Sequence, residues 1–166
     1  MRQVPQYTLI GNGKLATHLC HYFSLCNIAV DQWHRRLPTP LADHLSASSH
    51  VLLLINDDAI EPFVQANPIL ASKTLIHCSG VLNTPLAHSA HPLQTFGRKL
   101  YDKAHYERIP FITDAAGPDL ATLIPQLNNP SYALAATDKA YYHSLCTMGN
   151  NFTTLIWQHV FTQFEQ

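Results

Sequence analysis

The turn from Gly11 to Ala16 contains the first residues whose types and spacing could serve chemistry. Its Gly-x-Gly-x-x-Ala pattern lies between a segment with the apolar character of a strand and a segment with helical periodicity. In such a turn the first glycine allows a sharp bend, the second lets the backbone approach a pyrophosphate, and a small third residue packs the helix onto the sheet. The pattern predicts a dinucleotide site, with an ordinary glycine turn as the alternative. Its residues are Gly11, Asn12, Gly13, Lys14, Leu15 and Ala16.

The end of the second strand decides which dinucleotide fits. A carboxylate there bonds the ribose 2′-hydroxyl of NAD, and a guanidinium accommodates the 2′-phosphate of NADP. Asp31 lies about twenty residues beyond the first glycine, as the NAD pattern requires. If the strand instead continues to Trp33, the residues at the phosphate are His34, Arg35 and Arg36. We favour the second interpretation and expect NADP, with NAD as the second choice.

Two later strand ends also carry polar side chains. Ser79 follows one apolar strand, and His91, Gln94 and Thr95 lie at the end of a shorter one. In open parallel sheets, ligands bind beyond the carboxyl ends of the strands, so these residues are expected to line the ligand crevice. The segment 91–95 supplies groups that can bond a nicotinamide amide or a substrate. The alternative is that its proline-containing turn only supports the local structure.

His143 and Asn151 are the candidates for acid–base chemistry. They are eight residues apart, so on a regular helix they project within about 80° of each other and can face one cleft. Hydride transfer to a carbonyl or imine needs a proton donor, and histidine titrates near neutral pH. The alternative is a polar notch in a buried helix. The chain has 11 histidines, but no HExxH or CxxC pattern accompanies them, so we expect no metal.

Alternating strands and helices must position these residues. Apolar runs bounded by turn residues predict strands near 7–10, 28–33, 51–55, 74–78, 89–91, 109–113 and 132–135. Helical spacing predicts helices over about 15–27 and 118–127, and a capping box of Asp58 with Glu61 predicts a helix from there to Leu70. This alternation predicts an α/β fold with a doubly wound, mostly parallel Rossmann sheet.

The segment from Asp138 to Glu165 has a different character. It predicts one long helix that carries two apolar stripes, and no Asp, Glu, Lys or Arg lies between Tyr141 and Phe164. The stripes comprise Leu145, Met148, Phe152, Leu155 and Ile156, and Trp157, Phe161 and Phe164. Its polar residues argue against a membrane span. We expect one stripe to face the chain's own domain and the other to form a homodimer with a second copy of this helix.

Composition narrows the classes of function. The chain has 166 residues, 46% apolar content and a net charge of −1 without a run of basic residues, which argues against nucleic acid as a partner. Four cysteines without CxxC spacing, and no signal-peptide pattern, indicate the cytoplasm. We expect a dinucleotide-binding domain over 1–137 and a C-terminal helix over 138–166, the remnant or start of a helical dimerisation domain.

Several motifs together resemble the Rossmann-like oxidoreductases called domain of unknown function 2520. They are the turn at Gly11, the strand that runs into Asn56-Asp57-Asp58, the His77-Cys78-Ser79-Gly80 strand end, the run from His91 to Phe96, and Tyr142-His143 with Asn151-Phe152. The resemblance implies cofactor contacts at Asn56, Asp57 and Ser79. It also implies kinship with pyrroline-5-carboxylate reductases, β-hydroxyacid dehydrogenases and imine-reducing enzymes.

The resemblance and the residues together predict an NADP-dependent oxidoreductase. It would transfer hydride to or from a carbonyl or imine centre of a small molecule whose identity the sequence does not specify. Members of the resembled family continue beyond this point as a helical bundle that helps to form the substrate site. A module that binds or senses a dinucleotide and dimerises without turnover is therefore the alternative function.

Overall fold

The computed structural model describes residues 5–164. In chain order its strands are β1 (Tyr7–Ile10), β2 (Val30–Trp33), β3 (His50–Leu53), β4 (Thr74–His77), β5 (His88–Pro92), β6 (Phe111–Asp114) and β7 (Ser131–Leu134). Its α-helices are α1 (Lys14–Leu25), α2 (Leu41–Leu45), α3 (Asp57–Ala66), α4 (Lys103–Glu107), α5 (Leu120–Leu123), α6 (Lys139–Thr147) and α7 (Thr153–Phe164). Short 3-10 turns η1 (Pro68–Ser72) and η2 (Ala136–Asp138) and a π-helical turn η3 (Met148–Phe152) complete the elements.

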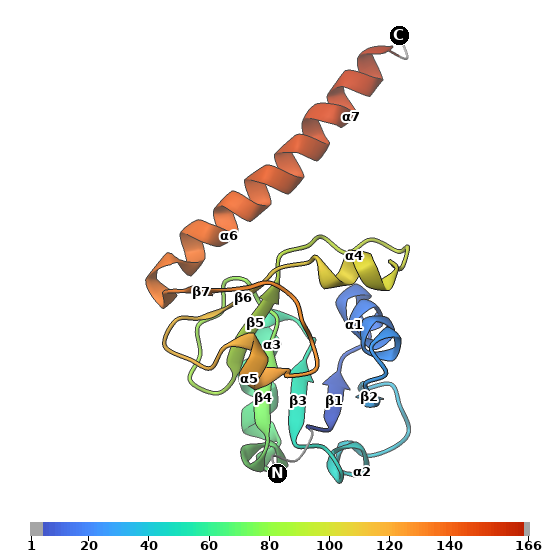
Figure 1. Ribbon diagram of the computed structural model, residues 1–166, viewed down its shortest axis with the longest axis vertical. Coiled ribbons are helices and arrows are strands. Elements are labelled where there is room, and N and C mark those ends of the chain that lie inside the picture. Colours follow the sequence, from blue (N-terminus) through green and yellow to red (C-terminus); the bar gives the residue numbers. More distant parts are fainter. Residues whose placement is uncertain (1–4, 165–166) are drawn as a thin grey trace.

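All seven strands form one sheet in the order β2-β1-β3-β4-β5-β6-β7 (Figure 1). Strands β1 to β5 are parallel, β6 is antiparallel to β5, and β7 is parallel to β6. The chain moves from β1 to β2 on one side and then to β3 on the other, so the strand order reverses at β1. Crevices beside such a reversal bind ligands in open α/β sheets. The expected fold class, a doubly wound and mostly parallel Rossmann sheet with a long C-terminal helix, is confirmed.

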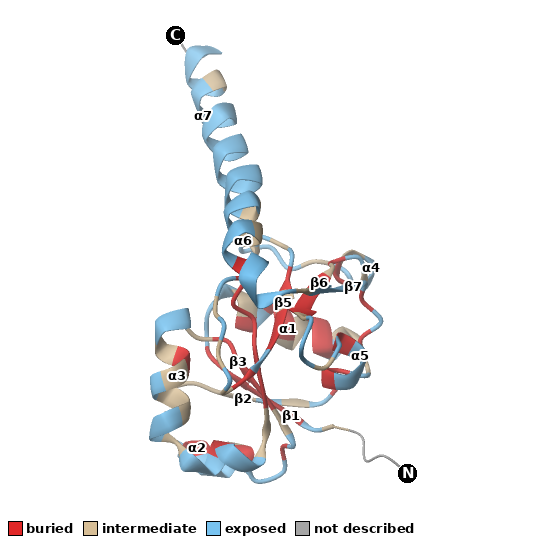
Figure 2. Cartoon of the chain, turned by 90° about the vertical axis from the view of Figure 1, so that its left-hand side faces the viewer, coloured by how far each residue is buried: buried red, intermediate tan, exposed pale blue. Residues whose placement is uncertain are grey.

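Helices cover both faces of the sheet because alternate strand residues point to opposite sides. Leu9 and Leu52 pack on one face with residues of α1, α4 and α5, and Ile10 and Leu53 pack on the other with residues of α2 and α3. Figure 2 shows α1 and α5 on one side of the strands and α2 and α3 on the other. Both clusters consist of buried side chains, so the two-sided burial expected of a parallel sheet is present.

Several expected helix boundaries were wrong. The capping box is absent from the described residues, because α3 begins one residue before Asp58 and no side chain caps it. This helix ends at Ala66, and Pro68 begins a separate 3-10 turn. The helix expected over 118–127 is the single turn α5, because Ile124 precedes Pro125 and residues before proline disfavour helical dihedrals. The short α2 and α4 were not expected.

The C-terminal helix does not lie on its own domain. Helices α6 and α7 continue through η3 as one long rod that projects away from the sheet (Figure 1), and almost all of α7 is exposed (Figure 2). Phe152, Trp157 and Phe164 are 53%, 57% and 83% exposed. The expectation that one apolar stripe covers the chain's own domain was therefore wrong for α7, and Glu165 lies outside the described residues. Within residues 5–164, no helix combines the length and apolar character needed to cross a membrane.

Candidate functional site

The turn between β1 and α1 is held in a conformation that favours glycine. Gly11 has a φ of +143°, and a Cβ at this position would lie 2.2 Å from the carbonyl oxygen of Leu54. The Gly11 N–H donates to the carbonyl of Trp33 at 2.9 Å, and the Gly11 carbonyl accepts from Gln32 Nε2 at 2.8 Å. The ends of β2 and β3 therefore set the shape of the predicted phosphate turn.

Gly13 precedes α1, and backbone strain does not explain the glycine at this position. Its φ of −87° is ordinary, and a Cβ would meet no atom of the described chain within 4 Å. Its bare backbone and the N–H groups at the start of α1 are thus open to an approaching phosphate. Ala16 is fully buried against the sheet, as expected of the third residue in the pattern. Lys14 and Leu15 do not line the cavity described next, and their contact with a cofactor stays a prediction.

A cavity of about 400 Å³, called the first cavity below, opens at the C-terminal ends of β1, β2 and β3. The predicted residues that line it are Gly11, Asn12, Gly13, His34, Arg35, Arg36 and Asn56. The lining residues that the sequence did not indicate are Ile10, Trp33, Leu54, Ile55, Ala59 and Phe63. Their apolar types predicted only core packing. The ring centroids of Trp33 and Phe63 lie 6.1 Å apart, so the cavity has an aromatic wall.

Strand β2 continues to Trp33, which is the strand end that the NADP interpretation assumed. Arg35 and Arg36 follow it on a loop and line the first cavity, whereas Asp31 does not. Asp31 Oδ2 instead lies 2.9 Å from Nδ1 of His44 on α2. The carboxylate that the NAD pattern would require is therefore engaged elsewhere.

Ser79 and Asp57 bond each other. The Ser79 hydroxyl donates to Asp57 Oδ2 at 2.5 Å and accepts from the N–H groups of Val81 and Leu82 at 3.2 and 2.9 Å. This fixes the loop after β4 against the start of α3. Neither residue lines either of the cavities described here, so their contact with a cofactor stays a prediction.

A second cavity, of about 590 Å³, brings together two segments that lie far apart in the sequence. Its walls come from the end of β5 and the loop after it, and from α6 and η3. The lining residues are His91, Leu93, Gln94, Thr95, His143, Cys146, Thr147, Asn150 and Asn151. All five residues predicted for the substrate, nicotinamide or acid–base roles thus line one cavity. Because β5 is parallel to β4, this cavity lies at the same edge of the sheet as the first.

The two histidines of the second cavity converge above Gly80. A Cβ on Gly80 would lie 2.8 Å from His143 Nδ1 and 3.0 Å from His91 Nε2, so a larger residue would displace the rings. His91 Nδ1 lies 2.9 Å from the Tyr142 hydroxyl. His143 Nδ1 is buried and has no hydrogen-bond partner in residues 5–164. This nitrogen therefore lies against Gly80, and His143 lines the second cavity with other atoms of its side chain.

Burial keeps two histidines near this cavity neutral at pH 7. The pKa of His91 is lowered to about 4, mainly by burial and next by the neighbouring His143. The pKa of His77, which lies on β4, is lowered to about 4, mainly by burial and next by Lys139. His91 can therefore donate or accept a hydrogen bond at neutral pH without carrying charge.

A buried ion pair joins α6 to the sheet. Lys139, 3% exposed, places Nζ 2.6 Å from Asp114 Oδ1 at the end of β6 and donates to the Leu82 carbonyl at 2.8 Å. Because Lys139 begins α6, these contacts hold His143, one turn later, above the end of β5. Lys139 was not among the predicted residues, and its only signal is that no Asp, Glu, Lys or Arg follows it up to Phe164.

A π-helical turn changes the relation between His143 and Asn151. The expected angle of about 80° assumed a regular α-helix. Residues Met148–Phe152 form a wider turn, which shifts the residues that follow around the helix axis. Asn151 lies within this turn and still lines the second cavity.

A further histidine belongs to the core. His18 is buried in the core, where Nδ1 lies 2.7 Å from the Tyr106 hydroxyl and Nε2 lies 3.2 Å from the Gly97 carbonyl. In the part of the chain that the structure describes, no group of three or more His, Cys, Asp or Glu residues is arranged to hold a metal ion.

Comparisons with solved structures find the same fold in several proteins of low sequence identity. A Bacteroides fragilis protein with the provisional description NADP oxidoreductase has a TM-score of 0.73 and 17% identity, over 98% of this chain and 74% of that one. A reductive aminase from Aspergillus terreus, solved with NADPH and ethyl levulinate, has a TM-score of 0.69 and 15% identity, over 95% of this chain and 65% of that one.

Another similar structure is a pyrroline carboxylate reductase from Plasmodium falciparum with NADP bound. Its TM-score is 0.63 and its identity 13%, over 93% of this chain and 67% of that one. The chain thus spans about two thirds to three quarters of these proteins. No protein-family model and no curated protein sequence matches the chain, so the family resemblance stays a prediction. Two of these neighbours were solved with NADPH or NADP, a Myxococcus stipitatus imine reductase variant with the same fold was solved with NAD+, and this chain has their fold.

Proposed function

We propose that the chain binds NADP(H) in the first cavity and transfers hydride to or from a carbonyl or imine carbon of a small molecule in the second. The observation that carries the proposal is the second cavity itself. Five residues that the sequence indicated for this chemistry line this cavity together. They come from segments about fifty residues apart and meet at the sheet edge that carries the phosphate turn. The neighbours with this fold bind NADPH or NADP.

The residues of the first cavity fit a dinucleotide phosphate. The bare backbone at Gly13 and the start of α1 would hold the pyrophosphate, and Arg35 with Arg36 would pair with the 2′-phosphate. The aromatic wall of Trp33 and Phe63 suits the flat purine ring.

The residues of the second cavity would handle the proton. NADPH, when bound, supplies the hydride, and the carbonyl oxygen or imine nitrogen then needs a proton. The position of His143 in the wall of the second cavity supports it as the donor, with Asn151 as a second group that can bond the same atom. His91 is neutral and would orient the substrate through a hydrogen bond.

Calorimetric titration with NADPH and NADH tests the cofactor assignment. NADPH should bind more tightly, by about tenfold or more, because the 2′-phosphate gains a charge-assisted contact. Arg35→Ala should remove most of that difference and leave the affinity for NADH unchanged. A preference for NADH in the unmodified protein would contradict the proposal.

A second candidate function is a dinucleotide-binding module that assembles through α7 without turnover. The exposed apolar residues Trp157 and Phe161 support it, because their rings stack 5.7 Å apart on a face that residues 5–138 do not cover. Soluble monomers rarely expose contiguous apolar patches of this kind. We propose a homodimer through this helix for either function.

Two measurements separate these candidates. A screen of imines, keto acids and hydroxy acids that yields no turnover, with protein that still binds NADPH, would favour the non-catalytic module. The homodimer should sediment as such at micromolar concentration, and Trp157→Asp with Phe161→Asp should yield monomers or insoluble material, because charge would enter the interface. A monodisperse monomer of the unmodified chain would disprove the dimer.

A further inference from the structure

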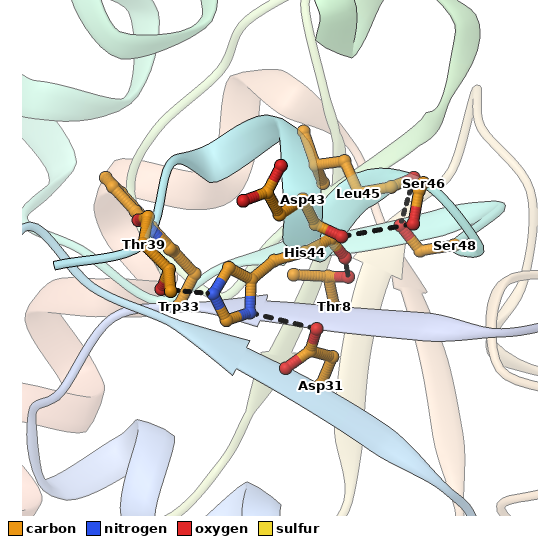
Figure 3. A network of polar contacts seen from close by, with 9 residues as sticks. All are labelled: Thr8, Asp31, Trp33, Thr39, Asp43, His44, Leu45, Ser46 and Ser48. Carbon is orange, nitrogen blue, oxygen red and sulfur yellow. Dashed lines mark hydrogen bonds and ion pairs between the residues drawn. The ribbon is translucent and has the colours of Figure 1, made fainter. Parts of the chain in front are cut away.

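A chain of three polar side chains lies beside the first cavity but outside it. Asp31 on β2, His44 on α2 and Thr39 on the loop between these elements contact one another in sequence (Figure 3). Asp31 Oδ2 lies 2.9 Å from His44 Nδ1, and His44 Nε2 lies 2.7 Å from the Thr39 hydroxyl. We call these three residues the relay.

The chemistry of the groups sets the direction of these bonds. An ionised carboxylate only accepts, so Nδ1 of His44 carries the proton and donates to Asp31. In the neutral ring Nε2 is then an acceptor, and the Thr39 hydroxyl donates to it. Both ring nitrogens are therefore satisfied, and the tautomer that satisfies one bond also satisfies the other.

The relay is anchored to the buried sheet. The hydroxyl of Thr8, a fully buried residue of β1, donates to the backbone carbonyl of His44 at 2.8 Å. On the other side, Trp33 Nε1 donates to the backbone carbonyl of Thr39 at 3.0 Å. The His44 imidazole thus connects Asp31 on β2 with Thr39 at the far end of the loop after β2. The backbone carbonyls of His44 and Thr39 accept the two further hydrogen bonds.

This loop is the one that carries the two arginines. Arg35 and Arg36 are exposed, and a turn with the Leu37 N–H 2.9 Å from the His34 carbonyl is the main internal bond of the segment. Helix α2 at its far end is fixed by the buried Leu41 and Leu45, but without the relay the Trp33 indole would be the remaining side-chain hydrogen bond from the described loop to β2. A loop of this kind would sample many positions before a phosphate orders it.

We infer that Asp31, His44 and Thr39 are positioning residues that set the loop 34–40 for recognition of the 2′-phosphate. They do not line the first cavity and act by pre-ordering Arg35 and Arg36, which lowers the entropy lost on binding. The inference rests on the proposed NADP(H) function. An NAD site would use Asp31 to bond the ribose, whereas here Asp31 would favour NADP(H).

Affinities of the full chain for NADP+ and NAD+ test the relay. Asp31→Ala and Thr39→Val should each weaken NADP+ binding by about three- to tenfold and leave NAD+ binding unchanged, because only the 2′-phosphate uses the loop. Asp31→Asn, whose amide oxygen can still accept from Nδ1, and Thr39→Ser, which keeps the hydroxyl, should bind NADP+ nearly as the unmodified protein does. Asp43→Asn on α2 is the matched charge control, and it should change neither affinity.

The sign of the Asp31→Ala effect is decisive. Removal of a carboxylate near a phosphate site strengthens phosphate binding if only charge matters, so tighter NADP+ binding would overturn the relay. Equal losses for both cofactors would indicate a merely structural role and also overturn it, as would a selective loss of NAD+. Arg35→Ala keeps the two proposals apart: if it removes the NADP+ preference and the relay variants do not, the proposed function stands and the relay fails.

Discussion

The two cavities lie at one edge of the same sheet and are built in different ways. The first is formed by segments that are close in the sequence: one turn, the ends of three neighbouring strands, a loop and α3, all within about the first sixty-five residues. The second is formed by side chains from two segments about fifty residues apart, brought together by a helix that otherwise projects away from the domain. The first cavity is a product of the core, whereas the second depends on how α6 is attached.

This difference implies that the two sites should fail independently. Changes in the turn between β1 and α1 act on the sheet and on cofactor binding. Changes at the attachment of α6 act on the substrate cavity and leave the cofactor cavity intact. The following predictions test this separation in order of expected effect.

The largest effect is expected at Gly11. Gly11→Ala places a Cβ against the Leu54 carbonyl at a φ that L-residues rarely adopt, so it should lower the free energy of unfolding by about 3 kcal/mol or more and abolish cofactor binding. Gly13→Val is the matched comparison: it should leave stability within about 0.5 kcal/mol yet weaken both cofactors, because its side chain occupies the approach of the pyrophosphate. Urea unfolding and calorimetry measure the two quantities, and a stable Gly11→Ala protein would show that the turn can relax.

At the second cavity, His143→Ala should reduce turnover and spare the cofactor. A general acid contributes about 10²-fold or more to the rate, so kcat for any carbonyl or imine substrate found should fall by at least this factor, with NADPH affinity nearly unchanged. His159→Ala on the exposed part of α7 is the control histidine. Parallel losses in turnover and NADPH affinity would mean that His143 is structural and that the cavities are not separate.

Lys139→Met tests the attachment of α6. It leaves Asp114 without its buried partner, and should lower the free energy of unfolding by about 2 to 3 kcal/mol, less than for a fully enclosed pair because Asp114 is 24% exposed. Adding Asp114→Leu should restore much of that stability, since no unpaired charge then remains. NADPH affinity should persist in both variants. Its loss in a folded Lys139→Met protein would show that the two cavities are not independent.

The smallest effect is expected from mild acidification, because the change in stability accumulates gradually below about pH 6.5. His91 and His77 have a pKa of about 4 in the folded chain, below the value of 6.5 for an unburied histidine, so the unfolded chain binds these protons first as the pH falls. The free energy of unfolding should therefore be highest above about pH 6.5, decline down to about pH 4 and level off below it. His77→Asn with His91→Asn should flatten this slope in urea titrations. An unchanged slope would show that neither histidine is buried neutral.

Local patterns in the sequence were sufficient to predict the framework. The glycine turn, the apolar strands and the alternation of strands and helices identify a Rossmann sheet, because backbone conformation and two-sided burial impose them on neighbouring residues. The same patterns identified Gly11, Arg35 and His143 as members of cavities. They misplaced helix ends such as that of α5, where one proline outweighs the helical spacing of the residues before it.

Only the tertiary structure decided how distant residues meet. Asp31 satisfies the spacing of an NAD site, but its carboxylate is bonded to His44 on a helix that the sequence did not predict. Gly80 needs to be glycine because two histidines from other elements approach it, and Lys139 fixes α6 through a partner twenty-five residues away in the chain. Periodicity shows which face of a helix or strand is apolar. Which partner that face contacts depends on packing between segments that are far apart in the sequence. For the same reason, the sequence alone established that the segment after Asp138 carries two apolar stripes, and the fold decided that neither lies on its own sheet.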